Sequence, residues 1–298
     1  MKHLLKLEGM PRRAMEEILA SAEAVKAKRG GGETKPLDGQ IWAMIFTKSS
    51  TRTRVSFEVG IRELGGAVMF LNANDLQLGR GEPIKDTARV LGRMVHGAVI
   101  RTYAQADVEE FAEYSGIPTI NALTDDEHPC QILTDIFTFQ ERRGPIQGKV
   151  VTYVGDGACN VPVSWVHAAA ALDFELRIAA PSEFQPSAET LAKAGGNISC
   201  TQDIRAAVKG ADMVYTDVWV SMGMEAEAEE RLAKLAGYQI NGGLMCLAKP
   251  DALVMHCLPA YRGKEIDAET FEAHADTIFT QAENRLHTQK AILAWLAG

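Results

Sequence analysis

The sequence predicts an α/β protein made of two open parallel-sheet α/β domains joined by an interdomain helix. Three observations favour this fold class. Short apolar runs alternate with helical patterns along the chain, which is typical of parallel sheets covered by helices. The length of 298 residues exceeds the size at which a single hydrophobic core usually stops growing. One long helical pattern near the middle of the chain separates two series of strand patterns.

The chain opens with an amphipathic helix, because the apolar residues Met15, Ile18, Leu19, Ala22 and Val25 fall on one helical face. Two series of short apolar runs follow, and we interpret them as strands. The first series is expected near Ile41–Phe46, Ala67–Leu71, Gly97–Arg101 and Thr119–Ala122, and the second near Val150–Gly155, Glu175–Ala179, Met213–Asp217 and Ala252–Cys257. Helices are expected in most of the gaps.

The interdomain helix is expected in the segment HPCQILTDIFTFQERRGPIQG, which lies between the two series. Leu133, Ile136 and Phe137 form its apolar stripe, and Gly144-Pro145 ends it. The predicted domains are therefore residues 1–135 and 136–280, with residues 281–298 as a C-terminal helix that returns to the first domain.

The charge balance argues against nucleic acid as a partner. The chain has 31 basic and 39 acidic residues, a net charge of -8, whereas a nucleic-acid-binding protein normally presents a basic face. An anionic ligand must therefore be attracted by a local cluster of positive charge.

Cysteine usage and hydropathy predict a cytoplasmic protein that does not contact a membrane. The five cysteines are odd in number, widely spaced and without a C-x-x-C pair, so neither a disulfide framework nor a zinc site is expected. The N-terminus lacks the apolar core of a secretion signal, and the sequence has no run of 18 or more apolar residues.

Polar residues of unusual kinds follow the predicted strands at their carboxyl ends. They are Ser50 to Arg54, Arg101, His128, Asp156 to Asn160, Asp217 and Cys257. In open α/β sheets the ligand binds at this edge, so we expect a site there.

The segment KSSTRTR, residues 48–54, predicts an anion site. It places Ser50, Thr51, Arg52 and Thr53 at the first turn of a helix, where unpaired backbone N–H groups and the helix dipole favour an anion. Hydroxyl groups and a guanidinium complete a cradle for phosphate oxygens. The alternative is an ordinary N-cap with exposed arginines. The glycine-rich nucleotide loops are absent from the sequence, which indicates a small anion.

Three motifs resemble the aspartate and ornithine transcarbamoylase family: STRTR, then HPCQ at 128–131, then HCLP at 256–259. The resemblance extends from about Leu4 to the C-terminal helix. Three further segments are similar to the branch of the family that takes ornithine, namely LQLGRGEPIKDTARVLGRM at 76–94, DVWVSMG at 217–223 and ENRLHTQKA at 283–291.

The resemblance implies a site for carbamoyl phosphate. Its residues would be Ser50, Thr51, Arg52, Thr53, Arg101, His128, Gln131, Cys257, Leu258 and Arg285. The catalytic group would be Arg101 and His128, at the carbamoyl oxygen where negative charge grows, and Cys257, which with the Leu258 carbonyl would orient the attacking amine. Each has a structural alternative when taken alone: a helix-capping histidine, surface arginines and a packed cysteine. Lys48 is left outside this group.

The resemblance also implies an ornithine site made of Asn160, Asp217, Ser221 and the Met222 backbone. A carboxylate suits the α-ammonium of ornithine. Cys159 stands where many relatives have a second asparagine. Only a neutral amine can attack, yet an alkyl ammonium has a pKa near ~10.4, so the site must favour its deprotonation. We expect direct attack on the carbonyl carbon after domain closure, without a covalent enzyme intermediate.

The expected reaction needs no metal and no organic cofactor. The resemblance implies carbamoyl phosphate and L-ornithine as the partners, a place in arginine metabolism, and a homotrimer or a multiple of trimers, with the glycine-rich segment Leu76–Pro83 near a subunit boundary. Two alternatives stay open: a transferase for putrescine or another amine, and a non-catalytic paralogue. A nucleotide-dependent dehydrogenase is disfavoured because the dinucleotide fingerprint is absent from the sequence.

Overall fold

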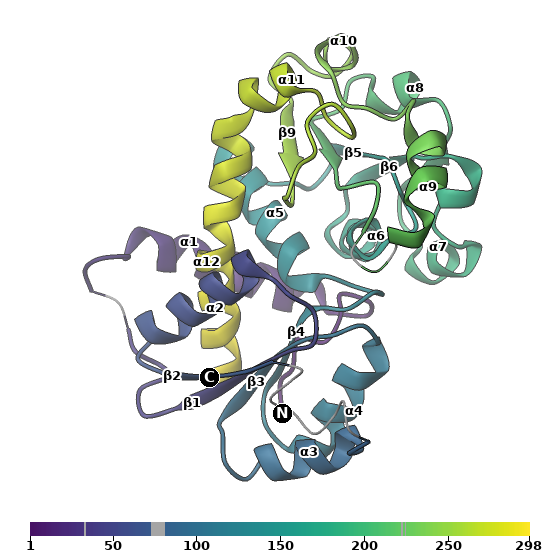
Figure 1. Ribbon diagram of the computed structural model, residues 1–298. Helices are drawn as coiled ribbons and strands as arrows, with labels where there is room; N and C mark the ends of the chain where they lie inside the picture. The colour runs from purple at the N-terminus through teal and green to yellow at the C-terminus, as the bar shows by residue number, and fades with distance from the viewer. Residues whose placement is uncertain (33, 73–80, 222, 224) are drawn as a thin grey trace. The chain divides into compact units, whose positions relative to one another are not determined.

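The computed structural model describes residues 1–32, 34–72, 81–221, 223 and 225–298 (Figure 1). The chain divides into two compact units. Unit 1 comprises Met1–Phe137 with Asn284–Gly298, and unit 2 comprises Thr138–Glu283. Both boundaries fall inside helices, the first in α5 (Pro129–Arg143) and the second in α12 (Ala275–Ala297).

Unit 1 contains a parallel sheet with the strand order β2-β1-β3-β4. Its strands are β1 (Ile41–Phe46), β2 (Ala67–Asn72), β3 (Gly97–Arg101) and β4 (Thr119–Leu123), and its helices besides α5 and α12 are α1 (Arg12–Ala27), α2 (Thr51–Glu63), α3 (Ile84–Leu91) and α4 (Gln105–Ser115). Alternate strand residues such as Ala43, Ile45 and Ile100 pack with Val108 and Phe111 of α4. In Figure 1, α3 and α4 cover this face of the sheet and α2 and α12 cover the other.

Unit 2 contains a parallel sheet with the order β7-β6-β5-β8-β9. Its strands are β5 (Val150–Val154), β6 (Glu175–Ala179), β7 (Ile198–Thr201), β8 (Met213–Thr216) and β9 (Leu253–His256). Its helices are α6 (Asn160–Leu172), α7 (Ala188–Ala194), α8 (Ile204–Val208), α9 (Ala228–Leu235), α10 (Gly242–Met245) and α11 (Ala268–Ala273), with 3₁₀ turns η2 (Ser182–Phe184) and η3 (Glu225–Glu227).

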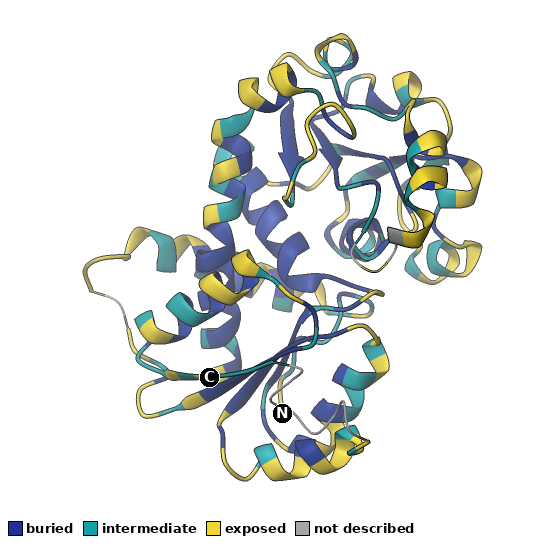
Figure 2. Ribbon diagram, viewed as in Figure 1, coloured by how far each residue is buried: buried dark blue, intermediate teal, exposed yellow. Residues whose placement is uncertain are grey.

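Alternation along β5 and β8 divides the core of unit 2 between the two faces of the sheet. Val154 and Val214 pack with Phe271 of α11 on one face. Tyr153 and Tyr215 stack on the other, with ring centroids 6.0 Å apart. Trp165 of α6 meets Tyr215 edge to face at 5.6 Å. Figure 2 shows the strands at the middle of each sheet buried and the outer faces of the helices exposed.

The predicted fold class is confirmed, and all eight predicted strands are present within two residues of their expected ends. The ninth strand, β7 (Ile198–Thr201), was not predicted, so the predicted second series is one strand short. This strand is four residues long and lies at the edge of its sheet, and none of its residues is fully buried. Its sequence, ISCT, therefore lacks the continuous apolar run that marks the central strands.

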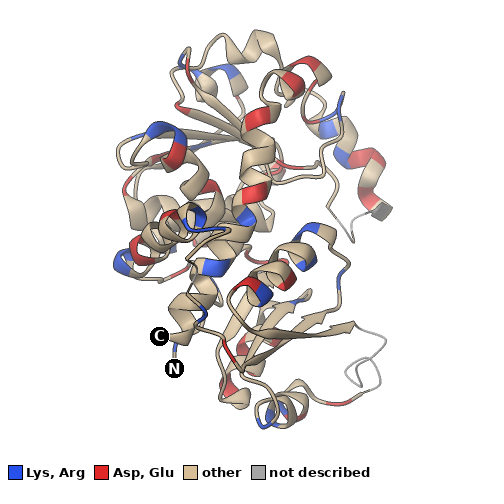
Figure 3. Ribbon diagram, turned by 90° about the vertical axis from the view of Figure 1, so that its left-hand side faces the viewer, with Lys and Arg blue, Asp and Glu red and all other residues tan. Residues whose placement is uncertain are grey.

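Charged side chains of both signs are spread over the outer helices. Figure 3 shows Lys and Arg interspersed with Asp and Glu on the outer helices, without a face of basic residues alone in this view of the described chain. Within the described residues, no helix combines the length and apolar character needed to cross a bilayer.

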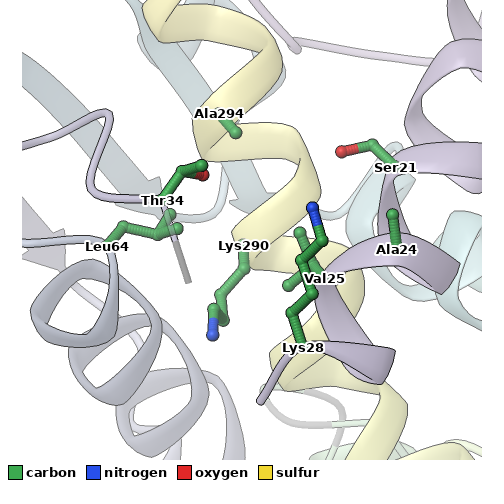
Figure 4. Close-up of a pocket in the computed structure, with 8 residues that line it drawn as sticks. All are labelled: Ser21, Ala24, Val25, Lys28, Thr34, Leu64, Lys290 and Ala294. Carbon is green, nitrogen blue, oxygen red and sulfur yellow. The ribbon is translucent and has the colours of Figure 1, made fainter. Parts of the chain in front are cut away.

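A fully buried lysine lies where α1, α2 and α12 meet in unit 1. A pocket of about 180 Å³ there is lined by Ser21, Ala24, Val25, Lys28, Thr34, Leu64, Lys290 and Ala294 (Figure 4). The Lys290 Nζ atom donates to Glu63 Oε2 at 2.7 Å, and Arg29 lies 3.1 Å from the other Glu63 oxygen. Burial acts to raise the pKa of Glu63, but the hydrogen bonds and charges of Lys290 and then Arg29 hold this pKa below 4.5.

We expect Glu63→Gln to lower the free energy of unfolding by about 2–3 kcal/mol, less than the ~3–5 kcal/mol of a fully buried pair because the Glu63 side chain is 23% exposed. The variant removes the carboxylate that compensates a buried ammonium. Because the folded-state pKa of Glu63 is depressed, the contribution is complete above the unfolded pKa and disappears as pH falls through the folded pKa. Thermal denaturation should therefore show a gap between the two proteins at pH 7 that shrinks below pH 4.5. A matched change in an exposed pair, Glu17→Gln, should leave the midpoint nearly unchanged.

Candidate active site

The start of α2 has the geometry of an anion site. Ser50 is the N-cap of the helix, and its side chain accepts a hydrogen bond from the Thr53 N–H at 3.3 Å. Thr51 and Arg52 are exposed in the first turn, whereas Thr53 is buried. The first turn of a helix has backbone N–H groups without partners inside the helix, and these point toward the residues that precede it.

Lys48, which the sequence analysis left aside, is part of this region. Its side chain is buried, forms an ion pair with Asp125 and lies 4.1 Å from the centroid of the Tyr103 ring. The ion pair joins the loop after β1 to the loop after β4, because Asp125 precedes the HPCQ motif by three residues. An open pocket of about 550 Å³ is lined by Phe46, Thr47, Lys48, Ser49, Ser50, Thr51, Arg54, Val55, Phe70 and Asn72.

Arg54 has a surface role in unit 1. Its guanidinium carbon lies 3.6 Å from the centroid of the Phe70 ring, and its Nε is 4.0 Å from Glu58. The side chain is 49% exposed. Arg54 therefore stacks on β2 at the margin of the pocket, and its ion pair with Glu58, one turn along α2, is long.

Arg285 connects three elements of unit 1. It lies on α12 and is 4% exposed. Its Nη2 donates to Thr53 Oγ1 of α2 at 3.1 Å, and its Nη1 donates to Gln131 Oε1 of α5. Gln131 in turn donates from Nε2 to Asp135 at 2.8 Å. The fold thus brings together three predicted site residues that are far apart in the sequence.

Arg101 and His128 follow neighbouring strands of the same sheet. Arg101 is the last residue of β3 and His128 stands just before α5, and both are buried. Burial lowers the pKa of His128 well below its usual value, and the positive charges of Arg285 and Arg101 lower this pKa further. His128 is therefore a neutral imidazole at pH 7, next to two guanidinium groups that can hold negative charge.

Cys257 and Leu258 belong to unit 2, so neither unit alone contains every residue predicted for carbamoyl phosphate. In unit 2, Asp217 follows β8 and Cys257 follows β9. The acceptor and donor atoms of Asp217, His256 and Cys257 all lie within 4.8 Å of one another. The adjacent parallel strands thus bring the predicted carboxylate and thiol to one edge of the sheet.

The other predicted ornithine residues lie after β5 and β8. Asn160 is the first residue of α6, and Ser221 is half-buried in the loop that follows Asp217. Met222 lies outside the described residues. Cys159 is the N-cap residue of α6, and its thiol lies 3.3 Å from the Asp156 carbonyl oxygen. Cys159 is therefore buried at the start of α6.

The HCLP turn is held through His256 by Glu265, a residue that was not predicted from the sequence. His256 Nδ1 accepts from the Leu258 N–H at 2.9 Å, which places the ring proton on Nε2, 3.2 Å from Glu265 Oε1. Glu265 also accepts from the Tyr261 N–H at 2.6 Å, and the His256 and Glu265 side chains are fully buried. This network holds Leu258 at φ 60°, a left-handed conformation that is strained for a residue with a side chain.

Asp217, His256 and Cys257 offer the kinds of donor atom that bind zinc. Both ring nitrogens of His256 already take part in the hydrogen bonds to Leu258 and Glu265. A cation at this position would have to break one of those bonds, so His256 serves first as a support for the HCLP turn.

The cysteines differ in their chemistry. Burial raises the pKa of Cys130 to about 12, even though Arg285 acts to lower it, so this thiol is inert. Burial, with the charges of Asp156 and Asp217, also raises the pKa of Cys159 well above its usual value. Cys246 is exposed and Cys257 is half-buried.

We expect a thiol reagent to modify Cys246 and Cys257 in the folded protein and to leave Cys130 and Cys159 intact. Mass spectrometry of peptides after brief alkylation will measure each site. L-Norvaline, which has the α-amino acid head group of ornithine but no δ-amine, should slow the modification of Cys257 and leave Cys246 as an internal control. Rapid alkylation of Cys130 would contradict its buried position.

Comparison with known proteins adds an independent finding. The model of the aspartate/ornithine carbamoyltransferase carbamoyl-P binding domain matches residues 2–141, and that of the Asp/Orn binding domain matches residues 147–296. An ornithine carbamoyltransferase of Akkermansia muciniphila is 54% identical over 300 residues, covering 100% of this chain and 98% of the relative. The solved ornithine carbamoyltransferase from Pyrococcus furiosus has 45% identity and a TM-score of 0.92, over 100% of this chain and 97% of that one. The anabolic enzyme from Campylobacter jejuni has 43% identity and a TM-score of 0.93, over 99% of both chains.

Proposed function

The chain belongs to the aspartate/ornithine carbamoyltransferase family, and we propose from this membership that it transfers the carbamoyl group of carbamoyl phosphate to L-ornithine, giving L-citrulline and phosphate. The observation that carries the proposal is the contact of Arg285 with Thr53 and Gln131 beside the start of α2. It gathers hydroxyl, amide and guanidinium groups where a small phosphate ester can be held.

Carbamoyl phosphate binds to unit 1 in this proposal. Ser50, Thr51, Arg52 and Thr53 hold the phosphate oxygens with the backbone N–H groups of the first turn of α2. Arg101, His128, Gln131 and Arg285 surround the carbamoyl group. As a neutral imidazole, His128 donates one hydrogen bond, and Arg101 supplies the positive charge that stabilises the oxygen as the tetrahedral intermediate forms.

Ornithine binds to unit 2. Asp217 receives the α-ammonium, while Asn160, Ser221 and the Met222 backbone receive the carboxylate. Cys257 and the Leu258 carbonyl orient the δ-amine, which attacks the carbonyl carbon directly. The C–N bond forms first and gives the tetrahedral intermediate. The nitrogen then passes a proton to a phosphate oxygen, and the C–O bond breaks with phosphate taking the electron pair. The positions of Asp217 and Cys257 on neighbouring strands support these roles.

The cellular setting and the assembly complete the proposal. All five cysteines are free thiols, which supports a reducing cytoplasm. L-Citrulline as the product supports a role in arginine metabolism. The family resemblance supports a homotrimer or a multiple of trimers, and the segment 76–83 that we expect at the subunit boundary lies mostly outside the described residues.

A substrate-panel assay tests the proposal. Phosphate release and ureido-product formation are measured with carbamoyl phosphate and, in turn, L-ornithine, putrescine, N-acetylornithine and L-aspartate. We expect L-ornithine to give the highest kcat/KM, with citrulline and phosphate in equal amounts. Highest turnover with putrescine would identify putrescine as the acceptor amine in place of L-ornithine. Absence of turnover with every amine would indicate a non-catalytic paralogue.

A further inference from the structure

A buried ion pair in unit 2 lies between the two segments that carry the proposed ornithine residues. Arg231 of α9 and Asp156, which follows β5, are 6% and 3% exposed. The Arg231 Nη2 atom donates to Asp156 Oδ2. Its Nε donates to the backbone carbonyl of Trp219 at 3.0 Å. One planar guanidinium therefore holds two loops in a fixed geometry.

The Asp156 side of this pair is fixed in its own right. Its second oxygen, Oδ1, accepts from the Ala158 N–H at 3.0 Å, which closes a tight turn. Gly157 lies so close to β6 and the loop after it that a Cβ atom there would be 2.6 Å from Ile178 Cγ2 and 2.9 Å from the Phe184 carbonyl oxygen. The Arg231 guanidinium carbon is 4.8 Å from the Phe184 ring centroid, so the same loop packs against it. The turn has little freedom to move.

The two residues that Arg231 contacts, Asp156 and Trp219, lie close to proposed ornithine ligands in the sequence. Asp156 precedes Asn160 by four residues, and the Trp219 carbonyl lies between Asp217 and Ser221 in the loop after β8. The pair consequently sets the spacing between the residue after β5 and the residues after β8. That spacing decides whether the carboxylate and the α-ammonium of one amino acid are received together.

Stability alone is a weak reason for such a pair. Burial raises the pKa of Asp156 even though the Ala158 N–H and Arg231 oppose this shift, so desolvation of the carboxylate is costly. Apolar side chains of similar size often replace a buried ion pair without loss of stability. A guanidinium, in contrast, offers two directed hydrogen bonds to two different segments.

We propose that Arg231 and Asp156 are positioning residues that set the preference for an amine with an α-amino acid head group. The proposal rests on the function proposed above. Neither side chain is assigned a contact with substrate. Loss of the pair loosens the grip on the head group and leaves the carbamoyl phosphate residues of unit 1 unchanged.

The test compares Arg231→Met with Lys234→Met, a control on the same helix whose exposed lysine pairs with Glu230 at 2.8 Å. For Arg231→Met we expect the KM for L-ornithine to rise about 10- to 100-fold, as when an outer partner that orients a binding residue is removed. The KM for carbamoyl phosphate should stay within about twofold. The ratio of kcat/KM for L-ornithine to that for putrescine should fall about tenfold or more. Putrescine lacks the α-amino acid head group, so its binding does not depend on the contacts that the variant weakens.

Two further variants keep the test decisive. Arg231→Lys retains the charge but cannot reach Asp156 and the Trp219 carbonyl with one planar fork, so an intermediate KM is expected. Asp156→Asn retains an acceptor for the Ala158 N–H but replaces the oxygen that faces Arg231 with an NH2 donor, so the ion pair and its hydrogen bond are lost, and the variant should resemble Arg231→Met. An unchanged ornithine-to-putrescine ratio in folded variants overturns the proposal, and so does unfolding of all three, because the pair would then serve stability. Failure of the unaltered protein to carbamoylate ornithine would instead reject the proposed function.

Discussion

Replacing Arg285 with methionine should lower kcat/KM for carbamoyl phosphate about 10²- to 10⁴-fold. The variant loses the two charge-assisted hydrogen bonds that the Arg285 guanidinium donates to Thr53 and Gln131, of ~1.5–3 kcal/mol each, and with them the organisation of the site. Arg285 reaches Thr53 and Gln131 from α12, so its guanidinium organises the site before substrate arrives. Methionine fills similar space without charge, which keeps the α2–α12 contact packed. Steady-state kinetics with carbamoyl phosphate varied at saturating ornithine will measure the effect.

The matched control for this change is Arg62→Met. Arg62 lies on α2, pairs with Glu58 at 3.0 Å and has a side chain that is 61% exposed. It should behave as the unaltered protein does. If Arg285→Met folds with an unchanged thermal midpoint and loses less than about threefold in kcat/KM, Arg285 does not bind the substrate.

Arg101→Met should reduce kcat about 10²- to 10³-fold, the usual cost of removing one group that stabilises a developing oxyanion. Arg101 ends β3 in a buried position and carries a positive charge close enough to lower the pKa of His128. Since this stabilisation is made mainly in the transition state, the KM for carbamoyl phosphate should change much less than kcat.

The same variant has a pH signature. Removing a positive neighbour favours the protonated imidazole, so the pKa of His128 should rise toward its ordinary value of 6.5. If the reaction needs neutral His128, the acid limb of the kcat profile should move to higher pH in Arg101→Met. If the variant only raises the KM for carbamoyl phosphate and leaves kcat and the acid limb unchanged, Arg101 acts in ground-state binding.

The sequence predicted the strands well because most of them are buried on both faces and appear as continuous apolar runs. It also predicted the edge where polar residues gather, since parallel strands place their carboxyl ends together. Ser50 is the clearest case, because an N-cap residue after a buried strand has a local signal, and the structure has its side chain capping Thr53.

The residues that sequence reasoning missed depend on tertiary burial. Arg231 stands among Glu and Lys residues on α9 and has the pattern of a solvated helix face, yet it is buried against Asp156. Glu265 lies in a polar turn and is fully buried beside His256. Lys48 has an ordinary surface composition around it. A charge that becomes buried through a partner far away in the sequence leaves no periodic pattern to detect.

In the proposed mechanism, the start of α2 and its neighbouring arginines bind carbamoyl phosphate. Calorimetric titration of carbamoyl phosphate into Arg52→Ala measures this binding, because Arg52 is exposed in the first turn and its removal should not disturb the fold. We expect affinity about 10- to 150-fold weaker for each charge-assisted hydrogen bond lost. Affinity equal to that of the unaltered protein would contradict it.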